Sequence, residues 1–177
     1  MPDTDTLQKL GNGLLFNISW LAIVSSQSTL IAVAVVVVHL TIHMLWMGRG
    51  GRELLFIAAL SLFGAASDHI LFALGVFNVN GQPAAAPIWL SCLWPVLATT
   101  LAHAFSVLQQ RLLLASVLGA IGGFASYSAG TAMSAVGFAD PLYGPVLIAA
   151  LWAILFPALA LAARLTFAHS DHAADRA

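Results

Sequence analysis

Two histidines four residues apart, His39 and His43, are the first side chains in this sequence that could do chemistry. They end an aliphatic run over residues 31–38, and residues four apart lie on one face of a helix. Two imidazoles on one face can bind a metal ion, and His103 could supply a third ligand. We therefore expect a single divalent metal as a candidate cofactor, held by His43, His103 and His39. The alternative is that each imidazole hydrogen-bonds to a backbone carbonyl or a hydroxyl.

Asp68 is a carboxylate inside a long apolar segment. An ionisable group inside a membrane is costly unless it is paired, and such groups often mark functional sites. We therefore predict that Asp68 and His103 are the catalytic residues if the chain is an enzyme, as acid/base or metal-binding groups. The alternative is a structural role, in which Asp68 bonds to Tyr127 or Ser126.

The composition indicates that these residues belong to a membrane protein. Hydrophobic residues make up 60% of the 177 residues and charged residues only 7%, whereas soluble domains carry roughly 25% charged residues. The net charge of −1 argues against nucleic acid as a partner. The single cysteine, Cys92, excludes an internal disulfide framework and a zinc ribbon.

Six apolar segments approach the length of about 20 residues that crosses a bilayer. We predict an all-α membrane bundle that forms a single domain over residues 1–177, with spans at about 11–26, 28–47, 53–77, 87–109, 112–135 and 144–167. An interfacial helix is the alternative for the first segment, which is short and contains polar residues. Six crossings place every basic residue on one side, and the positive-inside rule then puts both termini in the cytoplasm. The basic residues are Lys9, Arg49, Arg52, Arg111, Arg164 and Arg176.

The positions of the polar residues along the expected helices separate them into layers. At a rise of about 1.5 Å per residue, His43 and His103 share a layer toward the cytoplasmic side. Asp68 lies in a second layer, with His39 between the two. An elongated polar cavity fits this arrangement better than one compact site. We expect the cavity lining to include Asn12, His39, Trp89, Trp94, Thr99, Gly122, Gly123, Ser126 and Tyr127.

The segment 112–135 is rich in glycine and serine. The spacing Gly119-x-x-x-Gly123 is typical of helix faces that let two backbones approach closely. We interpret this face as a packing surface. The alternative is that Gly122 and Gly123 leave room for a ligand such as an acyl chain.

Several motifs together resemble a known family. They are Asn12 to Phe16 with Trp20, Asp68, Pro87-x-Trp89 followed by Leu93-Trp94, Ala98-Thr99-Thr100-Leu101-x-His103, and Gly119-Ala-x-Gly122-Gly123-x-x-Ser126-Tyr127. Over nearly the whole chain they resemble a family of small six-helix bacterial inner-membrane proteins of unknown function. Its members are often encoded beside cyclopropane-fatty-acid-synthase-like methyltransferases and flavin amine-oxidase-like proteins. The resemblance implies a role in membrane lipid modification.

These observations predict a multi-pass protein of the bacterial inner membrane that binds or presents lipid in an intramembrane cavity. Its expected partners are membrane lipids and a lipid-modifying methyltransferase or oxidoreductase. One alternative is a membrane enzyme that acts on lipids through Asp68 and His103. Another is a small proton-linked transporter or lipid translocator.

Overall fold

Helices make up most of the computed structural model, which describes residues 3–174 and the side chains up to residue 167. The helices and the two short strands follow one another as α1 (Thr4–Ser26), α2 (Thr29–Trp46), α3 (Gly51–Ala73), β1 (Phe77–Val79), α4 (Ile88–Ser91), α5 (Leu93–Ala102), η1 (Ser106–Gln110), α6 (Leu112–Met133), β2 (Val136–Phe138) and α7 (Tyr143–Ala174). The expected all-α bundle is therefore confirmed.

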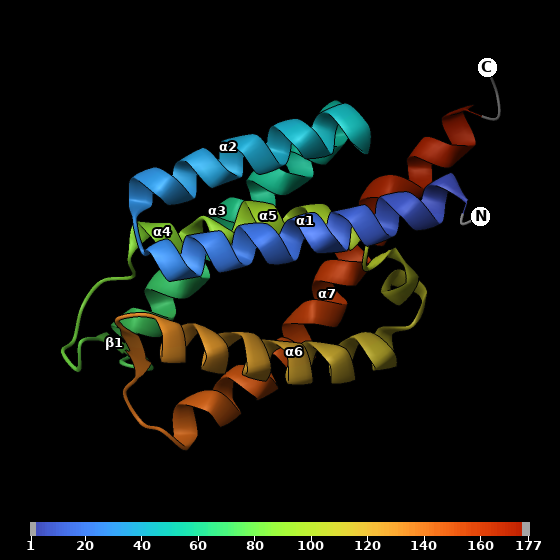
Figure 1. Ribbon diagram of the computed structural model, residues 1–177. Helices are drawn as coiled ribbons and strands as arrows, with labels where there is room; N and C mark the ends of the chain where they lie inside the picture. Colours follow the sequence, from blue (N-terminus) through green and yellow to red (C-terminus); the bar gives the residue numbers. More distant parts are fainter. Residues whose placement is uncertain (1–2, 175–177) are drawn as a thin grey trace.

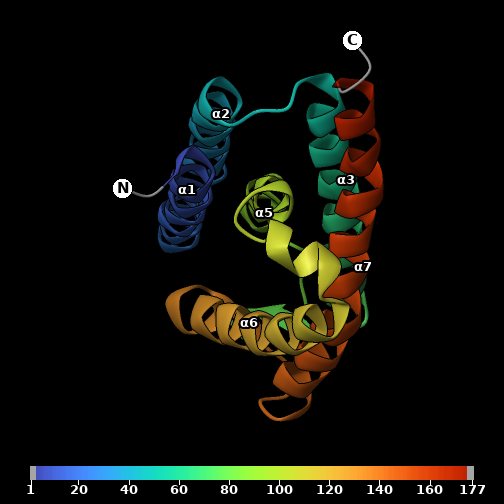
Figure 2. The same ribbon diagram turned by 90° about the vertical axis from the view of Figure 1, so that its right-hand side faces the viewer.

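The short helix α5 lies at the centre of the bundle. Figure 2 shows α1 and α2 on one side of it, α3 and α7 on the other, and α6 across the base. α5 is buried almost completely because long helices surround it, and its buried residues include Trp94, Thr99 and Thr100. The elements on which most of the polar candidates lie thus meet around one central helix.

Local signals in the sequence explain where the first two helices start and stop. Asp3 caps α1 by accepting the backbone N–H of Thr6 at 2.7 Å. Gln27 ends α1 in the left-handed conformation, with φ of 49°. Its side chain accepts the N–H of Ala135, so this turn is joined to the segment that follows α6. Ser28 then caps α2.

The helix ends that carry the basic residues gather at one end of the bundle. The start of α1, the end of α2, the start of α3, η1, the start of α6 and the end of α7 all lie there (Figure 1). Contacts join them: the Arg164 guanidinium donates to the carbonyl of Gln109, and the Arg49 guanidinium lies 5.6 Å from the Phe167 ring centroid. Arg176 lies outside the described residues. The arrangement agrees with the expectation that the basic residues lie on one side of the bundle. The cytoplasmic location of that side stays a prediction.

The outer surface of the bundle is apolar. Leu30, Leu45 and Leu113 are 80%, 85% and 87% exposed, and a soluble protein rarely exposes so many large apolar side chains together. Within the described part of the chain, four helices are long and apolar enough to cross a membrane, over Thr29–Trp46, Gly51–Ala73, Leu112–Met133 and Tyr143–Phe167. α1 is more polar, and the apolar stretch Ile88–Ala102 is shorter. The chain is therefore a helical membrane protein, and the count of six spans stays a prediction.

The segment expected as one helix over 87–109 is broken, and this corrects the sequence-based prediction. α4 stops at Ser91 and α5 begins at Leu93. Pro95 follows close behind the junction, and it has no N–H to donate to the carbonyl of Ser91. α5 then ends at Ala102, because the next residue, His103, has a φ of −123° and a ψ of −89°, which are not helical.

Two side chains from elsewhere satisfy the backbone where α5 ends. Oδ1 of Asn12, from α1, accepts the N–H of Ala104 at 3.3 Å. The amide of Gln109 donates to the carbonyl of Leu101 at 2.8 Å. A helix can end inside an apolar bundle only when its free backbone groups find such partners.

The connections at the opposite end of the bundle pair as two short antiparallel strands. Phe77 lies opposite Phe138, and Val79 lies opposite Val136. The sequence predicts turns here but not this pairing. The strands link the end of α3 to the α6–α7 connection, which closes this end of the bundle.

Candidate functional site

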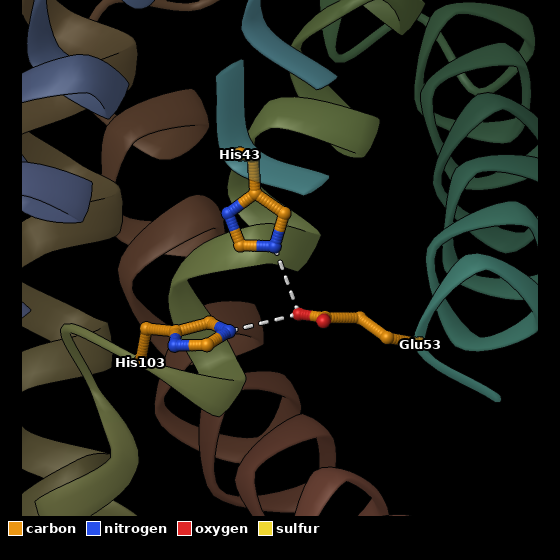
Figure 3. A group of neighbouring side chains, drawn as sticks. All are labelled: His43, Glu53 and His103. Atoms are coloured by element: carbon orange, nitrogen blue, oxygen red, sulfur yellow. Dashed lines mark hydrogen bonds and ion pairs between the residues drawn. The ribbon is translucent and has the colours of Figure 1, made fainter. Parts of the chain in front are cut away.

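His43, Glu53 and His103 converge deep inside the bundle. Nε2 of His43 and Nε2 of His103 both lie within hydrogen-bonding distance of Oε1 of Glu53, at 2.9 and 3.0 Å (Figure 3). The three residues are 0%, 1% and 5% exposed. Their three ligand atoms lie within 4.8 Å of one another, so the group could hold a metal ion.

Three separate elements position these side chains. His43 lies in the last turn of α2, Glu53 lies in the first turn of α3, and His103 lies where α5 ends. The loop between α2 and α3 is tight, with Gly50 at φ of 83°, a conformation that favours glycine. Oε2 of Glu53 accepts the backbone N–H of Arg49 in this loop at 2.6 Å, which leaves Oε1 for the two histidines.

His39 does not join this group. Its Nδ1 lies 2.9 Å from Oγ of Ser19, and its Nε2 lies 3.0 Å from Oγ1 of Thr99. Thr99 also donates to the carbonyl of Val96. Both imidazole nitrogens of His39 therefore have hydroxyl partners, and Glu53 takes the place that the sequence assigned to a third histidine.

Asn12 connects the two histidines of α2. Its Nδ2 lies 3.4 Å from Nδ1 of His43 and 3.5 Å from Oγ1 of Thr99, while its Oδ1 accepts the N–H of Ala104. Asn12 is completely buried. One amide from α1 thus holds together α2, α5 and the turn that carries His103.

An apolar cavity of about 410 Å³ lies on the other side of α5. It is lined by residues of α1, α3 to α7, η1 and the strands. Of the residues expected to line a cavity, the lining includes Trp89, Trp94, Gly122, Gly123, Ser126 and Tyr127, together with Asp68. It does not include Asn12, His39 or Thr99 among the residues that the structure describes, and these three belong instead to the buried hydrogen-bond network.

Asp68 supplies a carboxylate to this cavity. Its Oδ2 accepts the indole N–H of Trp94 at 2.8 Å, and Tyr127 is its neighbour on the α6 side. Gly64, one turn earlier in α3, leaves room for the indole: a Cβ there would lie 1.8 Å from Cδ2 of Trp94. Asp68 and His103 have different partners, so the structure does not bring the two predicted catalytic residues together.

The glycines of α6 divide between packing and open space. A Cβ at Gly119 would lie 2.5 Å from Cβ of Phe156, and one at Gly123 would lie 2.4 Å from Cγ of Trp152. A Cβ at Gly122 would meet nothing within 4 Å. The packing interpretation is therefore right for the face toward α7, while Gly122 borders the cavity.

Glu53 is the residue of this group that sequence reasoning missed. It follows Arg49 and Arg52 at the start of an apolar segment, where an acidic residue commonly caps a helix. One signal was present: the loop from His43 to Glu53 is short, so the two residues must lie at similar depth. The expectation that His43 and His103 share a layer agrees with their ring centroids, which are 4.9 Å apart.

The fold and these two features define a helical membrane protein with a buried histidine–glutamate group and an apolar internal cavity. Residues 9–158 match the model of a family described as "Protein of unknown function (DUF2878)", and the chain belongs to this family. No curated protein and no solved structure matches the chain.

Proposed function

We propose that this protein is an inner-membrane protein of bacteria that binds a lipid in its apolar cavity and presents it to a lipid-modifying enzyme. The observation that carries the proposal is the cavity itself, about 410 Å³ in volume and apolar except for a few groups that include the Asp68 carboxylate. Small-molecule sites have volumes of about 300–1,000 Å³, mostly apolar walls and a few polar groups that orient the ligand.

Each part of the lining has a role in this proposal. Trp20, Leu97 and Phe105 surround an acyl chain, and Gly122 leaves the space that a side chain would fill. Asp68 lies where it can accept a hydrogen bond from a hydroxyl or amine of the lipid. The partner enzyme, a methyltransferase or an oxidoreductase, is inferred from the family resemblance.

A membrane enzyme is the second candidate, and the His43–Glu53–His103 group favours it because such groups can hold a single divalent metal ion. The separate partners of Asp68 and His103 argue against one reaction that uses both. Lipid binding by a protein that passes its ligand to an enzyme needs only the cavity, and we therefore rank it first.

Filling the cavity tests the proposal. The Gly122→Leu side chain meets no atom near its Cβ and enters the cavity, so the fold is kept while the ligand is displaced. Gly51→Leu is the matched control, because a Cβ at Gly51 also meets nothing but Gly51 does not line the cavity. After gentle detergent extraction, mass spectrometry of co-purified lipids should show at least about a tenfold loss of bound lipid for Gly122→Leu only.

Equal lipid content in wild type, Gly122→Leu and Gly51→Leu would refute the lipid site. Asp68→Asn separates the two candidate functions, because asparagine keeps an oxygen for the Trp94 indole but not the charge. Lipid presentation predicts that the partner reaction in cells that carry Asp68→Asn falls only as far as the amount of bound lipid falls. Loss of that reaction with normal lipid content would favour the enzyme.

A further inference from the structure

Glu53, His43 and His103 form a site that the lipid cavity does not use. None of them is among the described residues that line the cavity. They come from three elements that are joined by few other polar contacts in the core, namely α2, α3 and the end of α5. We propose that they bind one zinc-class divalent metal ion, and that this ion fixes the three elements relative to one another.

The donor set fits this class of ion. Two imidazole nitrogens and one carboxylate oxygen are ligands for Zn²⁺ and similar ions, at about 2.0–2.2 Å each. Ligands at that distance and at a tetrahedral angle lie about 3.3 Å apart. The nitrogens of His43 and His103 lie 2.9 and 3.0 Å from Oε1 of Glu53, and all three ligand atoms lie within 4.8 Å of one another, so small side-chain movements admit the ion.

The contrast with His39 separates this group from an ordinary buried histidine. His39 meets two hydroxyls, one on each ring nitrogen, and is fully paired without any ion. His43 and His103 instead direct Nε2 at the same carboxylate oxygen from two sides (Figure 3). Three ligand atoms within 4.8 Å of one another are close enough to share one metal ion.

Charge supports the same conclusion. Glu53 is 1% exposed inside an apolar bundle, and a buried carboxylate is costly unless a positive charge lies beside it. The Arg49 contact to Glu53 is made by the backbone N–H, while its guanidinium lies over Phe167. A divalent ion between Glu53 and the histidines supplies positive charge at the carboxylate. A proton on one imidazole is the rival explanation, and metal content distinguishes the two.

Outer contacts reach two of the ligands. Oε2 of Glu53 is fixed by the Arg49 N–H at 2.6 Å. Nδ1 of His43 faces the amide N–H₂ of Asn12, and this contact must give way when the ion binds Nε2, because the imidazole proton then moves to Nδ1. Such outer contacts orient metal ligands and commonly change affinity by about 10–100-fold. Because the group is buried and lies apart from the cavity, we assign the ion a structural role.

The test is metal content of the full chain, purified without a polyhistidine tag and supplied with Zn²⁺ or Co²⁺. We expect about one ion per chain, and visible Co²⁺ absorption typical of tetrahedral coordination. Glu53→Gln should weaken binding at least about 100-fold. Its single oxygen can still accept the histidine N–H groups, but its N–H₂ then faces the Arg49 N–H, so the unfolding temperature of the metal-free variant is compared with that of the metal-free wild type. Removing the ion should lower the unfolding temperature by about 5 °C or more.

Two histidine variants serve as controls. His69 is exposed on α3 and bonds the carbonyl of Ala65 in its own helix, away from the three ligands, so His69→Ala should keep the full metal content. His39→Ala should keep it too, because its partners are Ser19 and Thr99. The proposal is overturned if the folded wild type takes up no metal, or if Glu53→Gln binds as tightly as wild type. Bound lipid is measured on the same samples, and a loss of metal with unchanged lipid shows that the two sites fail independently.

Discussion

At the scale of single residues, Asn12 sets which nitrogen of His43 carries the proton. Because Oδ1 of Asn12 accepts the N–H of Ala104, its amide N–H₂ faces Nδ1 of His43, which must then be an acceptor. His43 therefore donates from Nε2 to Glu53. A metal ion on Nε2 requires the opposite tautomer, with a proton on Nδ1 that needs an acceptor.

Asn12→Asp supplies that acceptor, because one of its oxygens can take the Ala104 N–H while the other takes the His43 Nδ1–H. We expect Asn12→Asp to bind Zn²⁺ about tenfold more tightly than wild type, and Asn12→Leu to bind more weakly. Competition with a chromophoric chelator measures both affinities. Identical affinities for the two variants would show that Asn12 has no influence on the ion.

The same scale explains what the sequence could and could not predict about the site. The depth of each residue along its expected helix predicted that His43 and His103 share one layer, because helix rise is regular and both residues lie in apolar segments. Glu53 was not predicted as a site residue, because its neighbours Arg49 and Arg52 made it resemble an ordinary charged residue at the membrane surface. Long side chains reach across a layer, and sequence position does not tell which way they point.

At the scale of helices, we expect an added methyl group to have different effects on stability on the two faces of α6. Gly123→Ala forces a methyl group against the Trp152 side chain and should destabilise the protein by about 1–3 kcal/mol. Gly122→Ala places the same methyl group in open space, and its effect should stay within about 0.5 kcal/mol. Thermal unfolding in one detergent compares the pair, and equal losses would contradict the close packing of α6 on α7.

Hydropathy predicted the helices that are formed by one long apolar segment. It did not predict the helix boundaries that depend on residues distant in the sequence. The runs that became α2, α3, α6 and α7 are long and predominantly apolar, so their existence could be predicted. The break at His103 depends on Asn12 and Gln109, which supply partners for the freed backbone from other segments. The β1–β2 pair likewise joins residues that lie far apart in the sequence, which no local pattern encodes.

At the scale of the whole molecule, the gathered helix ends predict a topology that can be measured. Lys9, Arg49 and Arg164 lie on segments at one end of the bundle, and the β1–α4 connection lies at the other (Figure 1). The positive-inside rule places the first end in the cytoplasm. The 25-residue apolar stretch of α7 and the shorter α2 are both long enough to separate these ends across a bilayer.

Cysteine labelling tests this topology, because Cys92 is the only cysteine and can be replaced by serine. In that background we expect a membrane-impermeant maleimide to label Gln82→Cys in intact bacterial cells. Gly51→Cys should react only after the membrane is permeabilised, since it lies beside the basic residues. Thr4→Cys, at the exposed start of α1, decides whether α1 spans: it should react like Gly51→Cys, only after permeabilisation, if α1 crosses, because α1 runs alongside α2 and starts at the end of the bundle that carries the basic residues (Figure 1). Labelling of Thr4→Cys in intact cells would instead leave α1 as an interfacial helix and reduce the number of crossings.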